Sequence, residues 1–596
     1  MTDLTDKPNR RRALTDLDAT LLVEAAAGTG KTSLLAGRVL VLLAASVPPR
    51  EIAAITFTEF AAGELRDRVT DYLEEVLAGH VPVELRLAFP QGVAESQKRG
   101  LWQARTRMDE LTCTTIHGFC HDLLRTYAVE AAIDPGANIL DSVRADLAFG
   151  SIFEQWLRRR LDDAQSSADP IALVAQLDPI GAEDLLRKLA KFRREHRTAR
   201  PPAVDIDSRT DARFVACVGD FRRWFAAVGG PPGAEKDVNE LEQLAAHFRG
   251  KFAPAPDFGR LWNLAHPPPV TIMRKHTFDL MRYQRHGVWQ KAVGRVEGRR
   301  LAEEAAENYD GCAEAFRELI GRVATAIVST FTAELDELRD EFEDFKHRAA
   351  VLDFDDLLYL TRQVLRQNDK VREAAAKRFQ RILVDEFQDT DPIQAEIVFL
   401  LAGAGASGSP WYEQRLFPGR LFMVGDPRQA IYRFRGADIA TYRRAREAFE
   451  RDFLGNVLHV TSNFRSCEEI VRHINLCFEA PLRAQETGYV ALKSTRGAAA
   501  HGLPCVVKVK IDAPARVADI RDEEARVVAE TCARLIGNIT LRRGEGSRDP
   551  LRPEISPCWR RLERTSGATS GRWRKPDFRS ARRQEKISSG VRKRRT

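Results

Sequence analysis

Short apolar runs that end in polar residues recur along this chain of 596 residues. Each run has the length and composition of a buried parallel strand. The runs are Leu21–Glu24, Ile52–Thr56 and Ile382–Val384, with further strand signals at Leu421 and Val457. Amphipathic helical patterns follow the first two runs, over Thr32–Ala45 and onward to about Leu77. Alternation of strand and helix predicts a parallel α/β sheet.

A long helical stretch interrupts this alternation from about residue 131 to residue 350. Its last part, Ala313–Ala349, has the pattern of one or two long helices. Lys31 and Asp385, which the motifs below assign to one site, are 354 positions apart. The chain is therefore expected to hold one nucleotide-binding domain that is split by a large helical insertion.

Composition narrows the class of protein only a little. The chain is 44% hydrophobic and 30% charged, as in an ordinary globular protein. Leu34–Ala45, a long apolar run, is too short to span a membrane and contains Arg38. The nine cysteines form no C-x-x-C pair, so neither a zinc ribbon nor a disulfide framework is indicated. We expect a cytoplasmic protein without a membrane partner.

The net charge of +7 is concentrated at one end of the chain. Residues 541–596 contain 18 Lys and Arg but only 6 Asp and Glu, which leaves about −5 for the other 540 residues. Overall charge is therefore weak evidence for a nucleic-acid partner, and local motifs must decide.

A phosphate-binding loop is predicted after the first strand. Its eight residues are Ala25, Ala26, Ala27, Gly28, Thr29, Gly30, Lys31 and Thr32. The pattern is that of a P-loop with alanine in place of the first glycine. Gly28 and Gly30 let backbone amides turn toward phosphates, Lys31 reaches them, and Thr32 helps to hold Mg²⁺. A glycine-rich turn before a helix is the plain alternative, and the intact Gly-Lys-Thr disfavours it.

Carboxylates end the strand Ile382–Val384 and predict the rest of an ATP site. Asp385 suits a Mg²⁺ ligand, and Glu386 suits the base that orients the attacking water. An isolated Asp-Glu pair would be a solvated surface pair, but the apolar run before it and Gln-Asp-Thr after it favour the functional interpretation. Gln429 is the candidate γ-phosphate sensor, and Arg465 is a candidate arginine finger from a following domain.

Together these segments resemble the UvrD/Rep branch of superfamily 1 DNA helicases, and most of all its RecB/AddA-type helicase–nuclease subunits. The matching blocks are Leu21–Val69, Thr112–Leu124, Val351–Leu358, Ile382–Gln394, Leu421–Tyr442 and Val460–Asn475. The resemblance implies a RecA-like motor domain that uses ATP and Mg²⁺. It further implies 3′-to-5′ movement on single-stranded DNA, action at DNA ends in double-strand break repair, and partnership with a second helicase–nuclease subunit.

The resemblance also implies residues that contact DNA and the base of ATP. The DNA set is Thr56, Phe57, Thr58, His117, Phe119, Tyr432, Phe434 and Arg435. Aromatic rings suit this role because stacking is worth about 1–3 kcal/mol per base and tolerates any sequence. Phe464 stands where family members usually have a tyrosine that stacks on adenine.

The sequence departs from the family in two places. No glutamine precedes the P-loop within residues 1–24, so the adenine-reading residue of UvrD-type members is absent. Beyond Asn475 the remaining motor motifs and a nuclease domain are not found. The expected domains are 1–130 and 351–452 (first motor domain), 131–350 (helical insertion), 453–540 (start of a second RecA-like domain) and 541–596 (basic tail).

Two alternatives remain open for the tail, and others for the function. The tail is a basic disordered arm that grips phosphates, or an out-of-frame translation that truncates a longer gene, which we favour. The chain is a working ATP-dependent helicase, a remnant that binds ATP and single-stranded DNA without unwinding, or an interaction subunit of a helicase–nuclease complex.

Overall fold

The computed structural model describes most of the chain. The described residues are 4–162, 169–274, 277, 279–404, 409–433, 436–483, 488–497, 505–508, 517–535, 540–543 and 547–550. They fall into two compact units, Met1–Thr115 with Ala376–Thr596, and Ile116–Ala375. The predicted domain limits remain predictions. No helix among the described residues combines the length and the apolarity that a membrane crossing requires.

A six-stranded parallel sheet forms the centre of the first unit, in the order β3-β2-β6-β7-β1-β8. The strands are β1 Leu21–Ala25, β2 Ile52–Thr56, β3 Thr112–Thr115, β6 Arg381–Val384, β7 Leu421–Gly425 and β8 Val457–Val460. β1, β2 and β7 are buried at every position, as strands covered on both faces should be. The predicted α/β class and the five predicted strands are confirmed.

Helices and short strands complete the first unit. They are α1 Lys7–Thr15, α2 Lys31–Ala44, α3 Glu59–Leu77, α4 Glu95–Arg105, α16 Pro392–Ala402, α17 Ile439–Asp452, α18 Glu468–Arg483, α19 Val517–Leu535, β9 Ser462–Cys467, β10 Lys493–Arg496, β11 Thr540–Arg543 and β12 Ser547–Pro550. α15 Asp369–Arg378 lies at the boundary of the two units. β8 was predicted within the second motor domain, but it pairs with β1 in the first sheet.

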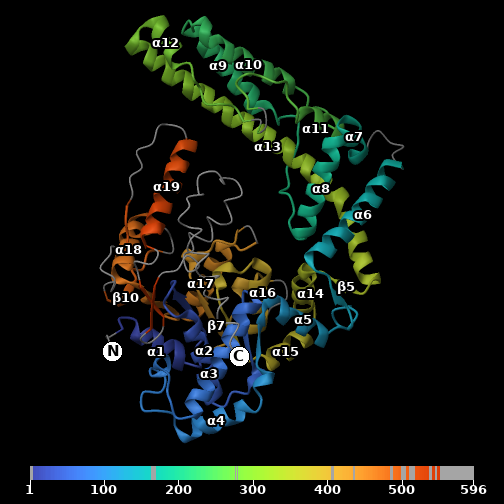
Figure 1. Ribbon diagram of the computed structural model, residues 1–596. Helices are drawn as coiled ribbons and strands as arrows, with labels where there is room; N and C mark the ends of the chain where they lie inside the picture. Colours follow the sequence, from blue (N-terminus) through green and yellow to red (C-terminus); the bar gives the residue numbers. More distant parts are fainter. Residues whose placement is uncertain are drawn as a thin grey trace, which may run out of the picture. The chain divides into compact units, whose positions relative to one another are not determined.

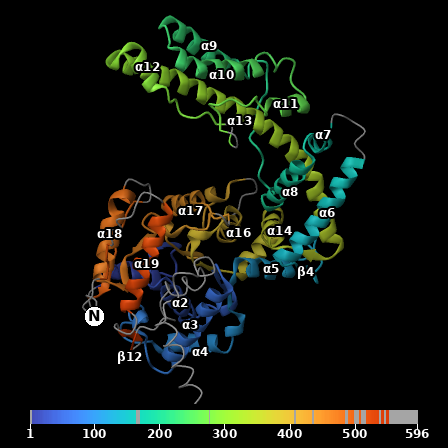
Figure 2. The same cartoon turned by 45° about the horizontal axis from the view of Figure 1, so that its top comes forward.

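The second unit is almost entirely helical. Its elements are α5 Ile116–Thr126, β4 Asn138–Ile139, α6 Ser142–Asp162, α7 Pro170–Leu177, α8 Pro179–Glu195, α9 Ala212–Ala227, α10 Pro232–Phe248, α11 Phe258–Leu264, α12 His286–Val293, α13 Arg295–Arg348, β5 Val351–Leu352 and α14 Phe354–Gln367. Figures 1 and 2 show α9, α10 and α12 beside the long helix α13.

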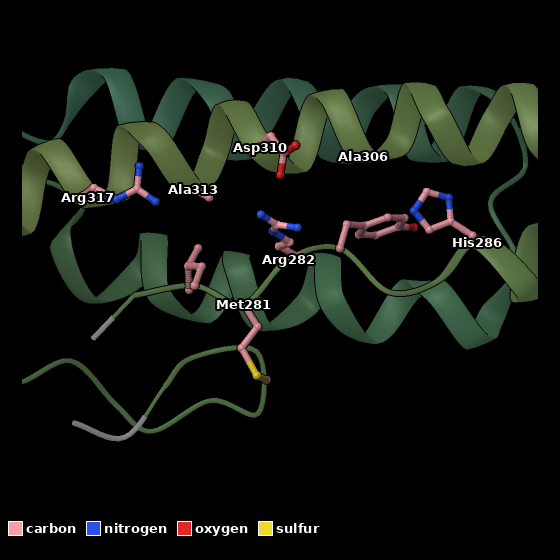
Figure 3. A pocket seen from close by; sticks show the side chains of 9 residues that line it. Met281, Arg282, His286, Ala306, Asp310, Ala313 and Arg317 are labelled. Atoms are coloured by element: carbon pink, nitrogen blue, oxygen red, sulfur yellow. The ribbon is translucent and has the colours of Figure 1, made fainter. Parts of the chain in front are cut away.

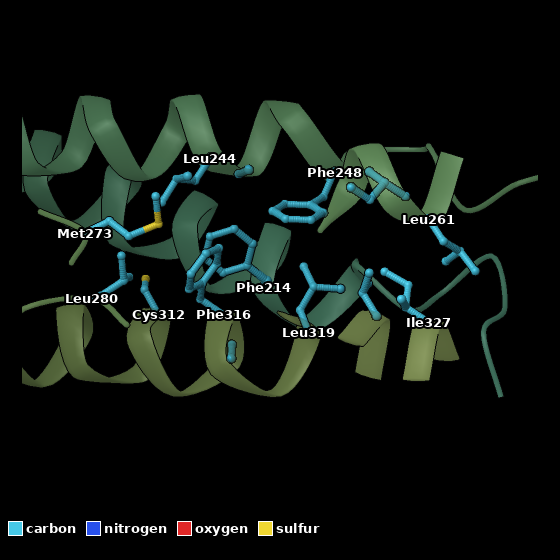
Figure 4. Packing of buried hydrophobic residues seen from close by; sticks show 14 of the residues in the cluster. Phe214, Leu244, Phe248, Leu261, Met273, Leu280, Cys312, Phe316, Leu319 and Ile327 are labelled. Atoms are coloured by element: carbon cyan, nitrogen blue, oxygen red, sulfur yellow. The ribbon is translucent and has the colours of Figure 1, made fainter. Parts of the chain in front are cut away.

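α13 organises the core of this unit. It is one helix of 54 residues and begins 18 residues before the predicted stretch Ala313–Ala349. Its buried residues recur every three or four positions, from Leu301 to Phe342, as an amphipathic helix requires. Figure 4 shows Phe316 of α13 packed against Phe214 of α9, with ring centroids 5.2 Å apart. The insertion therefore has a hydrophobic core of its own.

Candidate ATP site and DNA-facing residues

The loop between β1 and α2 has the backbone of a phosphate cradle. Gly28 and Gly30 have φ of +76° and +82°, a left-handed region that side chains other than glycine's rarely enter. Lys31 is the first residue of α2, is 9% exposed and pairs with Glu386. Thr32 follows it and is half-buried. The loop amides and the helix N-terminus together can bind an anion.

Residues Asn463–Arg465 of β9 lie directly against this cradle. The Phe464 N–H donates to the Gly28 carbonyl at 2.7 Å, and Asn463 Nδ2 donates to the Ala27 carbonyl at 2.8 Å. A Cβ atom on Gly28 would lie 2.7 Å from the Cβ of Arg465. The structure thus brings Phe464 and Arg465, both with exposed side chains, to the edge of the phosphate loop.

A buried ion pair on α1 holds β9 in this place, and it was not predicted. Asp6 accepts hydrogen bonds from the amides of Thr461 and Ser462 at 2.8 Å, and it pairs with Arg10 at 3.0 Å. Arg10 donates to the carbonyls of Thr29 and Ser462 at 2.9 and 3.0 Å. Its guanidinium also lies 4.9 Å from the centre of the Phe464 ring. The i, i+4 spacing of Asp6 and Arg10 was the available signal.

The predicted carboxylates lie together at the end of β6. Asp385 is 9% exposed, and burial and the charge of Glu386 raise its pKa to about 6. The same two causes raise the pKa of Asp389 to about 6. Glu386 has a φ of +49°, a strained conformation of the kind that functional sites retain. Lys31 is the cation that offsets this group of acids.

Gln388 connects these acids to the loop that follows β7. Its Nε2 donates to Glu386 at 2.9 Å and to Asp389 at 3.1 Å, and its Oε1 accepts from the Asp426 amide at 2.8 Å. Asp426 in turn accepts a hydrogen bond from Gln429 Nε2 at 2.7 Å. The predicted sensor Gln429 is therefore joined to the predicted base Glu386 through two residues. Gln388 is 1% exposed, and its place among the acids of this segment was the signal for it.

Glu24, at the end of β1, is a second residue without a predicted role. Its carboxylate pairs with Arg446 at 3.1 Å and with His459 at 3.2 Å, and it accepts from the Tyr442 hydroxyl at 3.3 Å. Although burial opposes the effect, hydrogen bonding to His459 and the nearby positive charges hold the pKa of Glu24 below its usual value. This cluster joins β1, α17 and β8 behind the phosphate loop.

The DNA-facing residues of the first unit are divided by their burial. The rings of Phe57 and Tyr432 lie 5.0 Å apart at an interplanar angle of 35°, and Phe57 is half-buried. Thr58 is exposed, and its hydroxyl caps α3 by accepting from the Ala61 amide. Thr56 is 3% exposed, and its hydroxyl donates to the Thr58 carbonyl. Phe434 and Arg435 lie outside the described residues.

The second unit holds the other two predicted DNA residues. Phe119 is 1% exposed, so its ring belongs to the interior and offers no face to a base. His117 makes an edge-to-face contact with Phe354, with ring centroids 5.8 Å apart. Phe354 is 46% exposed and opens α14, within a block that matched the family but without a predicted role of its own. A phenylalanine between aspartates, directly after a short apolar run, was the available signal.

A separate cavity of about 520 Å³ lies in the second unit (Figure 3). Its lining includes Arg282, His286, Asp310 and Arg317, contributed by α12, α13 and the segment before α12. The described residues that were predicted to contact ATP or DNA do not line it.

Comparison with known families agrees with this geometry. Residues 6–450 match the model of the UvrD/REP helicase N-terminal domain. The chain belongs to the UvrD/REP helicase family. The match covers the sheet strands β1 to β3, β6 and β7, the phosphate loop, and the helical insertion. The resemblance inferred from the motifs is thereby confirmed.

Similar members of the UvrD/REP family are named as subunits of an ATP-dependent helicase/nuclease. The protein of Bacillus pumilus (strain SAFR-032) is 25% identical over 499 residues, which cover 77% of this chain and 38% of that protein. The protein of Desulforamulus reducens (strain ATCC BAA-1160 / DSM 100696 / MI-1) is 26% identical over 513 residues, 78% of this chain and 38% of that protein. The chain thus spans little more than a third of the length of these relatives.

Proposed function

We propose that this chain is an ATP-driven motor that moves in the 3′-to-5′ direction on single-stranded DNA. The observation that carries the proposal is the continuous series of contacts Lys31–Glu386–Gln388–Asp426–Gln429. It runs from the phosphate loop to the segment that also carries Tyr432, whose ring lies against Phe57. Such a series can transmit a change at the phosphates to residues that stack on bases.

The side chains divide the work of ATP hydrolysis among them. Lys31 leaves Glu386 and donates to the phosphate oxygens, which frees Glu386 to orient the attacking water. Gln429 senses the γ-phosphate, and the exposed Arg465 stabilises the charge that develops on it. Phe464 offers its ring to the adenine, while Arg10 supports that ring from the protein side.

The oxygen donors beside Lys31 fit a magnesium ion. Asp385 is buried with an elevated pKa, and within the described residues Asp389 Oδ1 is buried without a hydrogen-bond partner. Carboxylates in this condition favour a hard dication, and Thr32 and Asp385 are the residues that would hold it. When bound with the nucleotide, such an ion neutralises phosphate charge.

Single-stranded DNA is proposed to contact the accessible members of the predicted set. In the first unit these are Phe57, Thr58 and Tyr432, and in the second unit they are His117 and Phe354. Thr56 and Phe119 are too buried to serve without rearrangement. Aromatic stacking would make binding tolerant of base sequence.

A partner and a pathway are proposed from the names of the relatives. Those names describe one subunit of an ATP-dependent helicase/nuclease. We infer that this chain works with a second helicase–nuclease subunit on DNA ends during recombination or break repair. Affinity purification of the tagged chain from its native cells tests this inference, because a second subunit with nuclease sequence motifs should copurify.

The decisive test is steady-state ATP hydrolysis with and without single-stranded DNA. We expect DNA to stimulate hydrolysis, and Lys31→Ala to lower kcat by about 100-fold or more because a preorganised phosphate contact is lost. Lys188→Ala, an exposed lysine of α8, is the matched control. Turnover without DNA stimulation would refute the motor. Nucleotide binding without turnover would favour the alternative, a non-unwinding ATP- and DNA-binding protein or an interaction subunit.

A further inference from the structure

Two cysteines that are 38 positions apart in the chain meet beside β9. The Sγ atoms of Cys467, the last residue of β9, and Cys505 are 3.2 Å apart. The carboxylate of Glu469 completes a group whose ligand atoms all lie within 4.8 Å of one another. All three residues are half-buried, so the group is packed and still within reach of solvent. The spacing of these cysteines forms no recognisable motif, so the site could not be predicted.

The donor set suits zinc. Zn²⁺ is bound by cysteine sulfur and by aspartate or glutamate oxygen, usually in a tetrahedral arrangement. Two sulfurs at Zn–S distances of about 2.3 Å are about 3.8 Å apart in such a site, so the pair needs to open only slightly. Cys467 ends a strand that pairs with β10, and Glu469 lies in the first turn of α18, so two of the donors are held by regular elements.

A disulfide explains the group less well than a metal does. The hydrogen bond with Cys467, together with loss of solvent and the charges of Cys467 and Glu469, raises the pKa of Cys505 to about 11. Disulfide exchange needs a thiolate, which these surroundings disfavour. Glu469 would have no part in a disulfide. A dication has the opposite effect, because it stabilises thiolates and carboxylate together.

We propose that Cys467, Glu469 and Cys505 bind a zinc ion, with a fourth position left for water. The ion would tie the segment 505–508 to the end of β9 and the start of α18. Because β9 also carries Phe464 and Arg465, the ion would anchor the strand that borders the phosphate loop. This inference does not depend on ATP hydrolysis, since its readouts are metal content and thiol reactivity.

The first experiment measures metal in the full chain, purified under reducing conditions and dialysed after addition of Zn²⁺. Mass spectrometry of the elements should find a stoichiometric amount of zinc, and replacement by Co²⁺ should give the thiolate-to-cobalt absorption band. Cys467→Ser and Cys505→Ser should each abolish both signals, and Glu469→Gln should weaken zinc affinity by at least ~10-fold. Cys477→Ser, an exposed thiol on α18 near His473, should change neither.

Thiol alkylation, mapped by peptide mass spectrometry, tests the site without any variant. Zinc should protect Cys467 and Cys505 from alkylation, and a chelator should expose them, while Cys477 reacts equally in both states. The proposal is overturned if the zinc-treated chain retains no stoichiometric metal, if Cys477→Ser alone removes the metal, or if both site thiols react equally with and without zinc. A Cys467–Cys505 disulfide that persists in reducing buffer would also overturn it.

Discussion

Gly28 is the residue at which the phosphate loop and β9 come closest. It combines a positive φ with a site where a Cβ would meet the Cβ of Arg465 at 2.7 Å. Gly30 shares the positive φ, but a Cβ there would meet only the Phe464 ring, at 4.0 Å. The two glycines therefore separate the effect of backbone conformation from the effect of close approach.

Gly30→Ala should destabilise the chain by about 1–2 kcal/mol, the cost of placing a side chain in the left-handed region. Gly28→Ala should cost more and should also weaken nucleotide binding, because β9 must move away from the loop. Urea unfolding and titration with a fluorescent ATP analogue measure the two effects. Equal losses in both variants would show that β9 does not press on the loop.

Gln388 is the residue through which the ATP site and the DNA-facing loop communicate. Gln388→Ala removes its bonds to Glu386 and to the Asp426 amide, so we expect the stimulation of ATP hydrolysis by DNA to fall by roughly ten-fold, about the value of one buried hydrogen bond. The loss should lie mainly in kcat rather than in the KM for ATP. Gln363→Ala, an exposed glutamine of α14, is the control. Unchanged stimulation would separate the two sites.

At the scale of elements, α1 acts as a fastener for β9. Arg10→Ala leaves Asp6 buried without its cation, a change that typically costs about 3–5 kcal/mol. The variant should therefore show a lower Tm and weaker binding of the fluorescent ATP analogue. Arg11→Ala, an exposed neighbour on the same helix, should leave both values nearly unchanged. A stable variant that binds nucleotide normally would argue against the fastener.

A buried charge cluster plays the same part in the second unit. Lys346, near the end of α13, lies 2.6 Å from Asp356 and 3.3 Å from Asp353, the residue that caps α14. Lys346→Met should lower the free energy of unfolding by about 3–5 kcal/mol, because it leaves both carboxylates buried with only Arg197 to balance them. Urea denaturation checks this value. Lys188→Met on α8 has an exposed partner and should change stability by less than about 0.5 kcal/mol.

These elements also show how far local sequence can lead. The strands of the sheet, the phosphate loop and α2 were predictable because each is a contiguous run with its own periodicity or motif. The contacts of Asp6 with Ser462, and of Cys467 with Cys505, were not predictable, because no local pattern encodes which distant segments meet. The membership of β8 in the first sheet was missed for the same reason.

At the scale of the whole molecule, the second unit should fold by itself. Its core draws only on residues between Phe149 and Phe342. Residues 116–375, expressed alone, should give a helical circular dichroism spectrum and a cooperative thermal transition. A spectrum without a transition would mean that the insertion depends on the rest of the chain.

The position of β1 within the sheet has a consequence for synthesis on the ribosome. β1 is made first, yet its two partners begin at Leu421 and Val457, some four hundred residues later. At roughly 5–20 residues per second, this apolar strand waits on the order of 20 to 80 seconds for its neighbours, while the helical unit has already left the ribosome. Nascent chains should therefore depend on a chaperone that shelters Leu21–Ala25, and the phosphate loop should become able to bind nucleotide only once β9 has emerged.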